Sequence, residues 1–397
     1  MPATKRRRLL SIAHSYCVDL NRRLAQELAR CGDWDVTAVG PASFRGDFAW
    51  HTMRAQDNEP CAVVPVPVHF SRRVQLMLYG RRLTRLLAEP WDMVHCWEEP
   101  YVAAAAQIAH AAGRDVPLVF ATFQNIAKQY PPPFNWIERY AMRRADGIIA
   151  FGRTVFDVVA RRAARDIPLQ VIPPGVDVDH FAPDPAARAA RLAASGWNDG
   201  VPVVGFVGRL VPEKGLLTLT AALDRVRAPW RALFVGAGPL ERDLRQWADK
   251  YGGRVRIETA VSHNEVAAHL NAMDMLCAPS RTTDAWREQF GRMLIEAFAC
   301  GVPVIASDSG EIPHVVGDAG IIVGERDDEG WVRAIAELLG HQARRAELGR
   351  RGRERAIGTF SWPVVARQHL EFFERVAQAR LRRAEASGEA AFMRAHS

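Results

Sequence analysis

The sequence predicts an α/β fold with two Rossmann-like domains that face each other across a cleft. Three observations lead to this prediction. Short apolar runs of strand length alternate with helical patterns, which is typical of βαβ units around a parallel sheet. A stretch rich in Pro and Asp, residues 173–190, interrupts the alternation, which then starts again. The length of 397 residues also suits two domains better than one.

Apolar runs in the first part of the chain predict the strands of the first domain. They lie at residues 9–13, 35–40, 61–68, 92–97, 117–122, 147–152 and 169–174. Amphipathic helical patterns lie between most of them, such as residues 21–32, which end at the stop signal Gly32. We therefore expect an N-terminal domain over residues 1–175.

The alternation after residue 190 predicts a second domain, residues 176–361. Its expected strands lie at residues 201–208, 231–238, 254–260, 274–280, 302–307 and 319–323. A long helical stretch follows at residues 362–386, and we expect residues 362–397 to return to the first domain. In sheets of this type, ligands bind outside the carboxyl ends of the strands.

Composition and charge exclude several classes of protein. Apolar residues make up 48% of the chain and charged residues of both signs 24%, which excludes a disordered chain. No apolar run approaches the ~20 residues of a membrane-spanning helix. The net charge is +7, and the first 190 residues carry 24 basic and 19 acidic side chains, an excess of five. Charge alone therefore admits an anionic membrane surface or nucleic acid as partner.

The cysteines and the N-terminus bear on the cell compartment. The six cysteines show no CxxC pair and no metal-type spacing; they are Cys17, Cys31, Cys61, Cys96, Cys277 and Cys300. We expect reduced, buried thiols and hence a cytosolic location. The apolar run 9–13 after the basic start is ended by His14. It is too short for a signal peptide, so we expect it to be the first strand.

The sequence VGRLVPEKG, residues 207–215, places two cations after an expected strand. Gly208 ends the strand, and Arg209 and Lys214 follow near its carboxyl end. Cations and glycines beside a helix N-terminus suit a phosphate or diphosphate, but a solvated surface loop is an equal alternative. The segment lacks the P-loop pattern, and the turn at residues 235–240 holds an incomplete dinucleotide fingerprint.

The sequence EQFGRMLIE, residues 288–296, separates two glutamates by eight positions. On one helix they would lie ~12 Å apart along the axis, which excludes a proton-sharing pair. Gly291 is the expected helix start, so the amides of residues 291–294 would favour an anion. Glu288 and Glu296 would then bind two parts of one extended ligand. The alternative is an exposed i, i+4 pair between Arg292 and Glu296.

The two segments, followed by residues 297–323, form an ordered pattern that strongly resembles the retaining glycosyltransferases of family 4, which have the GT-B architecture. The resemblance is dense over residues 172–324 and weaker over residues 1–170. Residues 173–183 look like the interdomain segment of that family. The resemblance implies a nucleotide-sugar donor bound mainly by the second domain, no separate cofactor and no metal.

The resemblance also implies roles for single residues. Arg209 and Lys214 would neutralise the donor diphosphate, and Glu288 would bind hydroxyls of the transferred sugar. Glu296 would bind the ribose hydroxyls. The remaining donor-binding residues would be Gly208, Gly291, Arg292, Met293 and Leu294 near the phosphates and Val261 near the nucleobase. A leaving diphosphate develops negative charge, which two cations and a helix N-terminus stabilise.

The first domain departs from the family pattern. Many members have a Gly-Gly loop after the first strand, whereas residues 14–20 here contain no glycine. Many also carry a His after the fourth or fifth strand, where this chain has Gln124 and Asn125. The acceptor-side candidates are therefore His14, His95, Glu98, Glu99, Gln124 and Asn125. For the histidines the alternative is packing at a strand end, and for the glutamates helix capping.

Residues 70–87 form a basic segment with alternating apolar residues. Two interpretations stand: a peripheral membrane contact, because many such enzymes act on lipid-linked acceptors, or a core-facing helix with a solvated basic side. Tyr130, Phe134 and Trp136 would either stack on a sugar acceptor or pack the domain.

The resemblance thus implies a retaining glycosyltransferase in the cytoplasm, either free or at the inner face of the membrane. It would move a hexosyl unit from a UDP- or GDP-sugar to a glycan or lipid-linked acceptor, in polysaccharide or glycoconjugate biosynthesis, without a nucleic-acid partner. Two alternatives remain. One is a sugar-nucleotide epimerase of the same architecture, for which no first-domain carboxylate pair is evident. The other is a non-catalytic subunit that binds nucleotide sugars.

Overall fold

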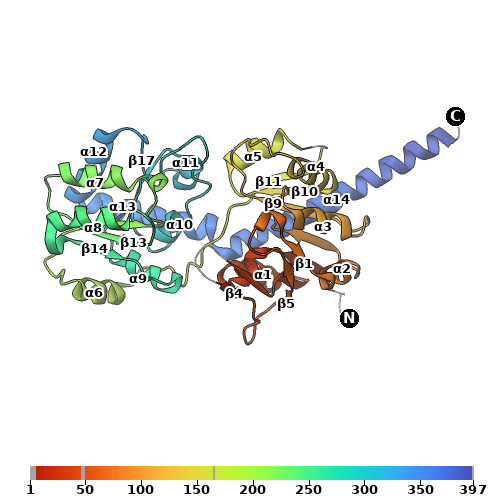
Figure 1. Cartoon of the computed structure of the whole chain (residues 1–397), viewed down its shortest axis with the longest axis horizontal. Coiled ribbons are helices and arrows are strands. Elements are labelled where there is room, and N and C mark those ends of the chain that lie inside the picture. Colours follow the sequence, from red (N-terminus) through yellow and green to blue (C-terminus); the bar gives the residue numbers. More distant parts are fainter. Residues whose placement is uncertain (1–5, 46–49, 164–165, 396–397) are drawn as a thin grey trace. The chain divides into compact units, whose positions relative to one another are not determined.

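A computed structural model describes residues 6–45, 50–163 and 166–395 of the chain. The chain divides into two compact units (Figure 1). Unit 1 comprises Met1–Pro173 and Trp362–Ser397, and unit 2 comprises Pro174–Ser361. The first boundary thus falls at Pro173, close to the predicted boundary at residue 175.

Unit 1 is built on a seven-stranded sheet, and all its paired strands run parallel. The strands are, in spatial order, β11 (Leu169–Val171), β10 (Gly147–Ala150), β9 (Leu118–Thr122), β8 (Met93–Cys96), β1 (Arg7–Ile12), β2 (Trp34–Pro41) and β5 (Ala62–Val66). Each lies within one of the seven predicted apolar runs or overlaps it, which confirms those predictions.

Helices cover both faces of this sheet. Alternate residues of each strand point to opposite faces, so Leu9 packs with one core and Leu10 with the other. The core around Leu9 includes α1 (Arg23–Arg30) and α14 (Trp362–Ala395). The core around Leu10 includes the helices α2 (Arg81–Leu87), α3 (Ala103–Ala111), α4 (Phe134–Arg144) and α5 (Arg153–Ala160).

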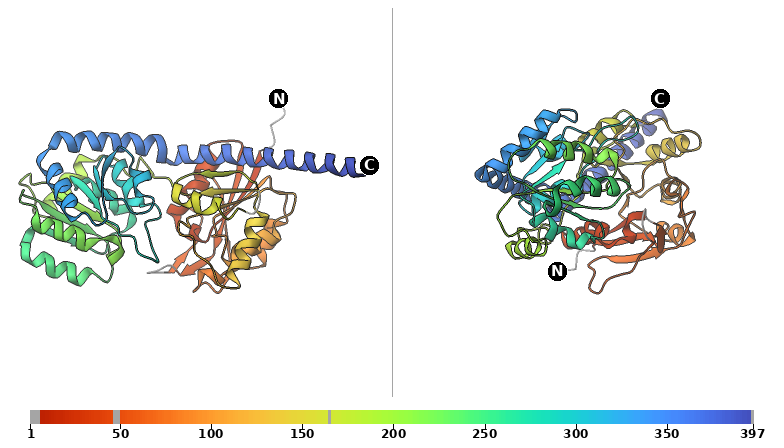
Figure 2. Two further views of the ribbon diagram at one scale, coloured as in Figure 1. Left: turned by 90° about the horizontal axis from the view of Figure 1, so that it is seen from above. Right: turned by 60° about the vertical axis from the view of Figure 1, so that its left-hand side comes forward.

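The C-terminal helix α14 belongs to unit 1, as predicted. Arg380 pairs with the buried Asp146 at 2.9 Å, and Arg7 pairs with Glu374 at 2.6 Å. Val376 lies so close to β10 that a Cβ at Gly147 would approach it to 2.4 Å. The helix therefore packs directly on the sheet of unit 1 (Figure 2).

The prediction of one amphipathic helix over residues 70–87 is wrong. Only Arg81–Leu87 form an α-helix, and Val74–Leu76 form a short 3₁₀ helix. β6 (Val68–His69) forms a short antiparallel hairpin with β7 (Leu78–Tyr79). Met77 and Tyr79 are buried while Leu78 is only half-buried, which is the period-two pattern of a strand. The Gln107 side chain also bonds both backbone groups of Tyr79, at 2.8 and 2.7 Å.

Unit 2 has a six-stranded sheet, again with parallel pairs throughout. The strands are, in spatial order, β14 (Val255–Glu258), β13 (Arg231–Val235), β12 (Val203–Val207), β15 (Met275–Ala278), β16 (Val304–Ser307) and β17 (Gly320–Val323). Its helices are α6 (Pro185–Ala194), α7 (Leu216–Arg225), α8 (Glu241–Ala248), α9 (Val266–Asn271), α10 (Arg292–Ala299), α11 (Ile312–Val316), α12 (Asp328–Gly340) and α13 (Gln342–Arg355). The predicted strands of the second domain are confirmed.

The two sheets share one topology. In each unit the first strand lies in the middle of the sheet. The next strands along the chain extend the sheet to one edge, and the later strands extend it from the first strand to the other edge. The switch falls between β1 and β8 in unit 1, and between β12 and β15 in unit 2. Ligands of such sheets bind outside the carboxyl ends of the strands at this switch point. In the described part of the chain, no helix is both long enough and apolar enough to cross a bilayer.

Candidate active site

An ion pair lies at the switch point of unit 2. Lys214 follows β12 and Glu288 follows β15, and the Lys214 Nζ contacts Glu288 Oε2. The Ser280 hydroxyl donates to the same oxygen at 2.9 Å. The two charged side chains are only 12% and 8% exposed, so solvent screens their attraction weakly. Two residues that the sequence singled out separately are thus brought together.

Gly215 allows this approach. Its backbone is left-handed, with φ of 71°, and a Cβ there would lie 1.7 Å from the carbonyl oxygen of Pro279. Any other residue would collide with that backbone atom and would also be strained at this φ. The glycine therefore lets the loop after β12 touch the loop after β15, next to Lys214.

A third loop, after β16, fixes the backbone of Glu288. The amide of Glu311 donates to the Glu288 carbonyl oxygen at 3.1 Å. Gly310 has φ of 57°, and a Cβ there would lie 2.1 Å from the same oxygen. Three strand-end loops of unit 2 thus hold Glu288 in one position.

Arg209 lies in the same loop after β12, five residues before Lys214. Its side chain is 48% exposed and lies 3.7 Å from Glu213, four residues further along the chain. The Trp286 ring covers the other cation, with Lys214 Nζ 5.1 Å from the ring centroid. Lys214 is therefore held by buried neighbours, whereas Arg209 is half-exposed and its only ion pair among the described residues is with Glu213.

Helix α10 begins as the sequence predicts. Gly291 is its N-cap, with a left-handed φ of 81°, and the helix runs over Arg292–Ala299. The first amides of a helix lack intrahelical acceptors and carry a partial positive charge; here the Leu294 amide is an exception and donates to the Gly291 carbonyl at 2.9 Å. The N-terminus of α10 follows Glu288 directly in the chain.

Glu296 lies inside the unit and not on its surface. It is 6% exposed, which rules out the exposed Arg292–Glu296 pair. Burial raises the pKa of Glu296, although the charge of Arg292 opposes this. His263 Nε2 lies 3.8 Å from Glu296 Oε1. Burial and the charges of Arg292 and His180 lower the pKa of His263 to about 4, so this imidazole is neutral at pH 7.

Val261 lies in the same loop as His263, between β14 and α9. Val261 packs, partly buried, against the core that also contains Met293 and Leu294 of α10. The nucleobase expected at Val261 and the ribose expected at Glu296 would therefore meet neighbouring parts of unit 2. The loop is closed by a capping box in which Ser262 and Glu265 bond each other.

The switch point of unit 1 also holds a polar cluster. His14 follows β1 and Glu98 follows β8, with His14 Nδ1 2.7 Å from Glu98 Oε2. The Tyr79 hydroxyl donates to Glu98 Oε1 at 2.7 Å, and Glu98 is fully buried. Burial lowers the pKa of His14, but the charges of Glu98 and Glu99 and the bond to Glu98 outweigh it and raise this pKa above 6.5.

Glu99 organises the loop after β9. It accepts bonds from the Thr122 hydroxyl at 2.5 Å and the Phe123 amide at 2.8 Å. Burial raises the pKa of Glu99 although both bonds oppose this. In the same loop Gln124 Nε2 donates to the Ile126 carbonyl at 2.8 Å, and Asn125 is 2% exposed. Helix α3 has no side-chain cap, so the capping interpretation of the two glutamates is wrong.

His95 is a packing residue. It is fully buried, and its ring lies 5.5 Å from that of His369 and 5.3 Å from that of Phe373, both on α14. Ser11 Oγ lies 3.2 Å from its Nδ1. Burial, with a smaller contribution from His369, holds its pKa well below the ordinary value. Because the ring faces α14 and not the strand ends, we remove His95 from the acceptor-side candidates.

Several residues of these sites were not anticipated. Ser280, Gly310 and His263 complete the unit 2 site, and Tyr79 completes the cluster of unit 1. No sequence pattern links Tyr79 to Glu98, because the two come from separate segments. Over the residues described here, no group of three or more His, Cys, Asp or Glu side chains is arranged to hold a metal ion. Five of the six cysteines are buried and all six are free thiols.

Comparison with known proteins links both units to one family. The model described as Glycosyl transferases group 1 matches residues 188–355, and the model described as Glycosyltransferase Family 4 matches residues 20–180. The first match lies within unit 2, and the second spans most of unit 1 and the first residues of unit 2.

Two curated relatives share the same printed name, GDP-mannose-dependent alpha-(1-6)-phosphatidylinositol monomannoside mannosyltransferase. The protein from Mycobacterium tuberculosis is 33% identical over 73% of this chain and 78% of its own length. The protein from Mycolicibacterium smegmatis is 36% identical over 57% of this chain, and the match spans only 62% of that protein. Among solved structures, sucrose-phosphate synthase from Thermosynechococcus elongatus has a TM-score of 0.71 at 21% identity, covering 94% of this chain and all of that one. This last likeness concerns the fold.

Proposed function

Because the chain belongs to the glycosyltransferases of family 4 and has their GT-B fold, we propose that it transfers a hexosyl unit from a nucleotide diphosphate sugar with retention of the anomeric configuration. The observation that carries this proposal is the buried Lys214–Glu288 pair at the switch point of unit 2, beside the N-terminus of α10. A cation, a carboxylate and a helix N-terminus together match the diphosphate and the sugar of one ligand.

In this proposal unit 2 binds the donor. Lys214 and the exposed Arg209 neutralise the diphosphate together with the α10 amides at residues 291–294. Glu288, released in part from Lys214 by the incoming phosphate charge, accepts hydrogen bonds from the sugar hydroxyls. Glu296 accepts from the ribose. Because Glu296 is buried, hydrogen bonds from the ribose would stabilise its carboxylate, since a buried carboxylate without hydrogen bonds is destabilising.

The chemical step is a displacement at the anomeric carbon. The bond from this carbon to the diphosphate oxygen breaks as the bond to the acceptor oxygen forms on the same face. The proton of the acceptor hydroxyl passes to the departing phosphate oxygen, so no side-chain nucleophile is assigned. Lys214, Arg209 and the helix N-terminus stabilise the charge that develops on the leaving group, and the step proceeds without a metal ion.

Unit 1 would bind the acceptor. The His14–Glu98 bond and the loop that carries Gln124 and Asn125 offer polar groups at the carboxyl ends of β1, β8 and β9. The neighbouring carboxylates Glu98 and Glu99 raise the pKa of His14 above its ordinary value, against the effect of burial, and His14 would donate to an acceptor oxygen.

The relatives sharpen the choice of donor and acceptor. Both are named as GDP-mannose-dependent enzymes acting on a phosphatidylinositol monomannoside, so GDP-mannose is the first donor to test and a lipid-linked glycan the first acceptor. An acceptor of that kind would place the enzyme in the cytoplasm at the inner face of the membrane. Residues 70–87 expose five arginines together with Phe70 and Leu76, which supports a peripheral contact there.

A thermal-shift panel of GDP-mannose, UDP-glucose and an ADP-sugar tests the donor site. A ligand that binds only the folded state raises its stability with concentration relative to Kd, so the true donor should stand out. The Lys214→Met variant should bind that donor about 100-fold more weakly. The control Lys250→Met changes an exposed lysine of unit 2 and should leave the thermal shift unchanged. NMR of the product then reports the anomer. A panel without any shift, or a Lys214→Met variant that binds as the wild type does, would contradict the proposal.

A further inference from the structure

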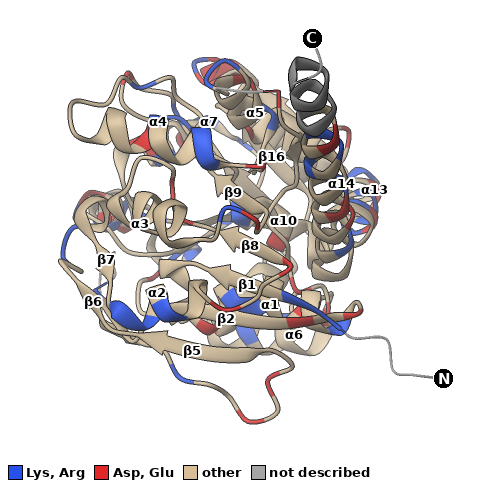
Figure 3. Cartoon of the chain, turned by 90° about the vertical axis from the view of Figure 1, so that its right-hand side faces the viewer, with Lys and Arg blue, Asp and Glu red and all other residues tan. Residues whose placement is uncertain are grey.

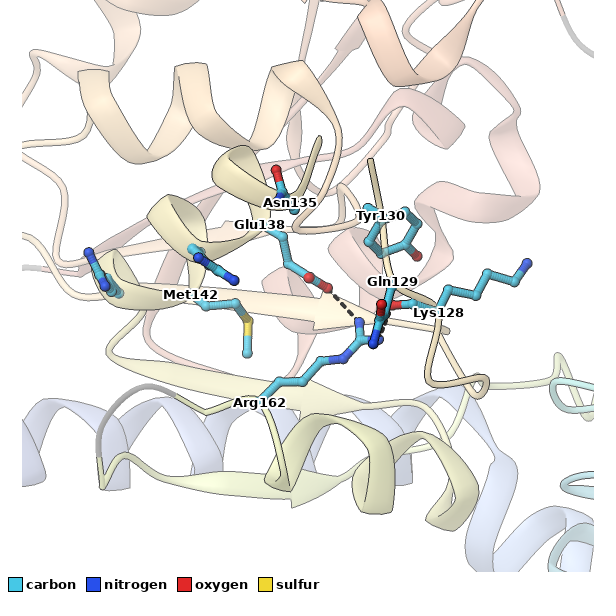
Figure 4. Close-up of a pocket in the computed structure, with 9 residues that line it drawn as sticks. Lys128, Gln129, Tyr130, Asn135, Glu138, Met142 and Arg162 are labelled. Carbon is cyan, nitrogen blue, oxygen red and sulfur yellow. Dashed lines mark hydrogen bonds and ion pairs between the residues drawn. The ribbon is translucent and has the colours of Figure 1, made fainter. Parts of the chain in front are cut away.

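A pocket on the outer side of α4 in unit 1 has no part in the proposed reaction. Its volume is about 620 Å³. Lys128 and Tyr130 line it from the loop before α4 (Figure 4). Arg139 and Arg143 of the helix itself also line it. It lies wholly within unit 1, so it is separate from the donor site of unit 2.

The pocket has an excess of positive charge. Four cationic side chains line it, Arg162 among them, against one carboxylate, Glu138. Arg162 is already neutralised, since it pairs with Glu138 at 2.6 Å and also donates to the Lys128 carbonyl. Lys128, Arg139 and Arg143 are exposed and form no ion pair with any residue in the described part of the chain. Three cations thus face the hollow without a counter-charge.

Two polar atoms of the lining also lack partners. Tyr130 Oη and Asn135 Oδ1 are both buried from solvent and have no hydrogen-bond partner within the described structure. The Tyr130 ring is fixed, because it stacks on Tyr101 with ring centroids 4.2 Å apart. Buried polar atoms are almost always hydrogen-bonded in native proteins. A bound ligand would supply the missing partner of Tyr130.

We propose that this pocket binds a phosphate-bearing group. A phosphate ester carries one to two negative charges and several strong acceptor oxygens. Arg139 and Arg143 supply the planar donors that suit phosphate, Lys128 a third charge, and Tyr130 an O–H donor. Burial raises the pKa of Tyr130, which keeps that hydroxyl protonated. The Glu138–Arg162 pair forms one wall of the pocket. Arg162, just after α5, also holds the loop before α4 through its bond to the Lys128 carbonyl.

The same helix face indicates where the phosphate could come from. Trp136, Arg139, Tyr140 and Arg143 follow the i, i+3, i+4, i+7 spacing of a single helix face. Trp136 is 62% and Tyr140 44% exposed. Aromatic and basic side chains on one exposed face suit the headgroup region of a bilayer, whereas the pocket alone would also accept a soluble phosphate ester. Figure 3 marks the basic residues of α4 and of α2 on the same layer of helices.

Two binding measurements on the full chain test the proposal and separate the two sources. Inorganic phosphate is titrated calorimetrically, and co-sedimentation is measured with vesicles of phosphatidylcholine alone and with added phosphatidylinositol. We expect the wild type to bind at least one of the two phosphate probes. Arg139→Ala and Arg143→Ala should each weaken that binding about tenfold, while the matched control Arg153→Ala, an exposed arginine of α5, should not. All three residues are on the surface, so the variants should unfold at the wild-type temperature.

The outcomes distinguish a lipid from a soluble ester. If the ligand is a lipid headgroup, Trp136→Ala also weakens sedimentation with phosphatidylinositol vesicles and leaves phosphate binding unchanged. If it is a soluble ester, phosphate binds and vesicle sedimentation does not depend on Arg139 or Arg143. The proposal is overturned if neither probe binds, or if the two arginine variants bind as tightly as Arg153→Ala.

Discussion

Both units have a cation–carboxylate pair at the same topological position, but different kinds of contact hold the pair in each unit. In unit 2 the pair is Lys214–Glu288, held by backbone contacts between strand-end loops. In unit 1 the pair is His14–Glu98, held by side chains such as Tyr79. Every described glycine with left-handed φ, from Gly196 to Gly317, belongs to unit 2.

This difference indicates what each site is suited to do. Tight loops with glycines bring backbone amides and a permanently charged lysine close to a ligand, which suits a diphosphate whose shape and charge do not vary. A buried network of side chains can change its shape with a single substitution, and this one contains the imidazole of His14, whose pKa is raised above its ordinary value. We therefore expect unit 2 to be intolerant of backbone changes and unit 1 to respond to pH.

The largest effect should come from Gly215→Ala. The added Cβ would lie 1.7 Å from the Pro279 carbonyl oxygen at a φ of 71°, so the two loops must separate and Lys214 must leave Glu288. We expect sugar transfer to fall by more than about 100-fold, as a shift of about 1 Å in a reacting group can cause, and unit 2 to lose about 3 kcal/mol of stability in urea unfolding.

Gly253→Ala is the matched control for this change. Its Cβ would meet no atom within 4 Å, so its stability should stay within about 0.5 kcal/mol of the wild type. Equal behaviour of the two variants would break the comparison, because it would mean that backbone contact between the loops of unit 2 does not matter.

The next effect concerns the charge of Glu288. Glu288→Gln keeps the size of the side chain and its acceptor oxygen but removes the charge that faces Lys214. We expect transfer to fall about 100-fold while the Tm falls by only a few degrees, because the Ser280 bond can persist. Steady-state kinetics with the donor found in the panel measure this. Unchanged transfer in Glu288→Gln would remove Glu288 from the proposed chemistry.

Much of unit 2 could be predicted from the sequence, because its site is built from short contiguous segments. The helix start at Gly291 and the strand ends before Gly208 and Ser280 follow from glycine positions and apolar runs. The contact of Lys214 with Glu288 could not be derived from sequence spacing. The two residues are 74 positions apart, and their contact depends on the conformations of the strand-end loops. The resemblance to a family implied only that both residues belong to one donor site, not that they touch.

Glu296→Gln should have opposite effects on stability and on binding. The folded-state pKa of Glu296 is raised above 4.5 by burial, so its ionisation destabilises the ligand-free unit as pH rises through that pKa. The neutral amide should therefore make the free protein slightly more stable at pH 7. It should also weaken donor binding about tenfold, because a charged acceptor is lost. Lower stability in Glu296→Gln would mean that the carboxylate has a structural partner.

Unit 1 was predicted less well, and the physical reason lies in its side chains. The seven strands follow from apolar runs, but residues 70–87 combine a hairpin and a helix whose apolar positions fit both periods. His95 lies within β8 and His14 follows the neighbouring strand β1. The ring of His95 faces α14, whereas His14 lies at the strand ends. Orientation of this kind depends on the packing of α14, which joins unit 1 from the far end of the chain.

The smallest effect, and the one that tests unit 1 directly, should come from His14→Gln. Because the folded-state pKa of His14 is raised above its ordinary 6.5, protonated His14 stabilises unit 1 fully below pH 6.5. This contribution is lost as pH rises through the raised pKa. Gln retains a donor for Glu98 without the charge, so the variant should lose about 1 kcal/mol at pH 6 and almost nothing at pH 9. Urea unfolding at the two pH values measures the difference in free energy of unfolding between the wild type and the variant. Titration of His263 and of the buried His95 affects both proteins equally and therefore cancels in this difference. A loss that is equal at both pH values would show that the pair acts through its hydrogen bond alone, and the contrast with the permanent charge of Lys214 would then disappear.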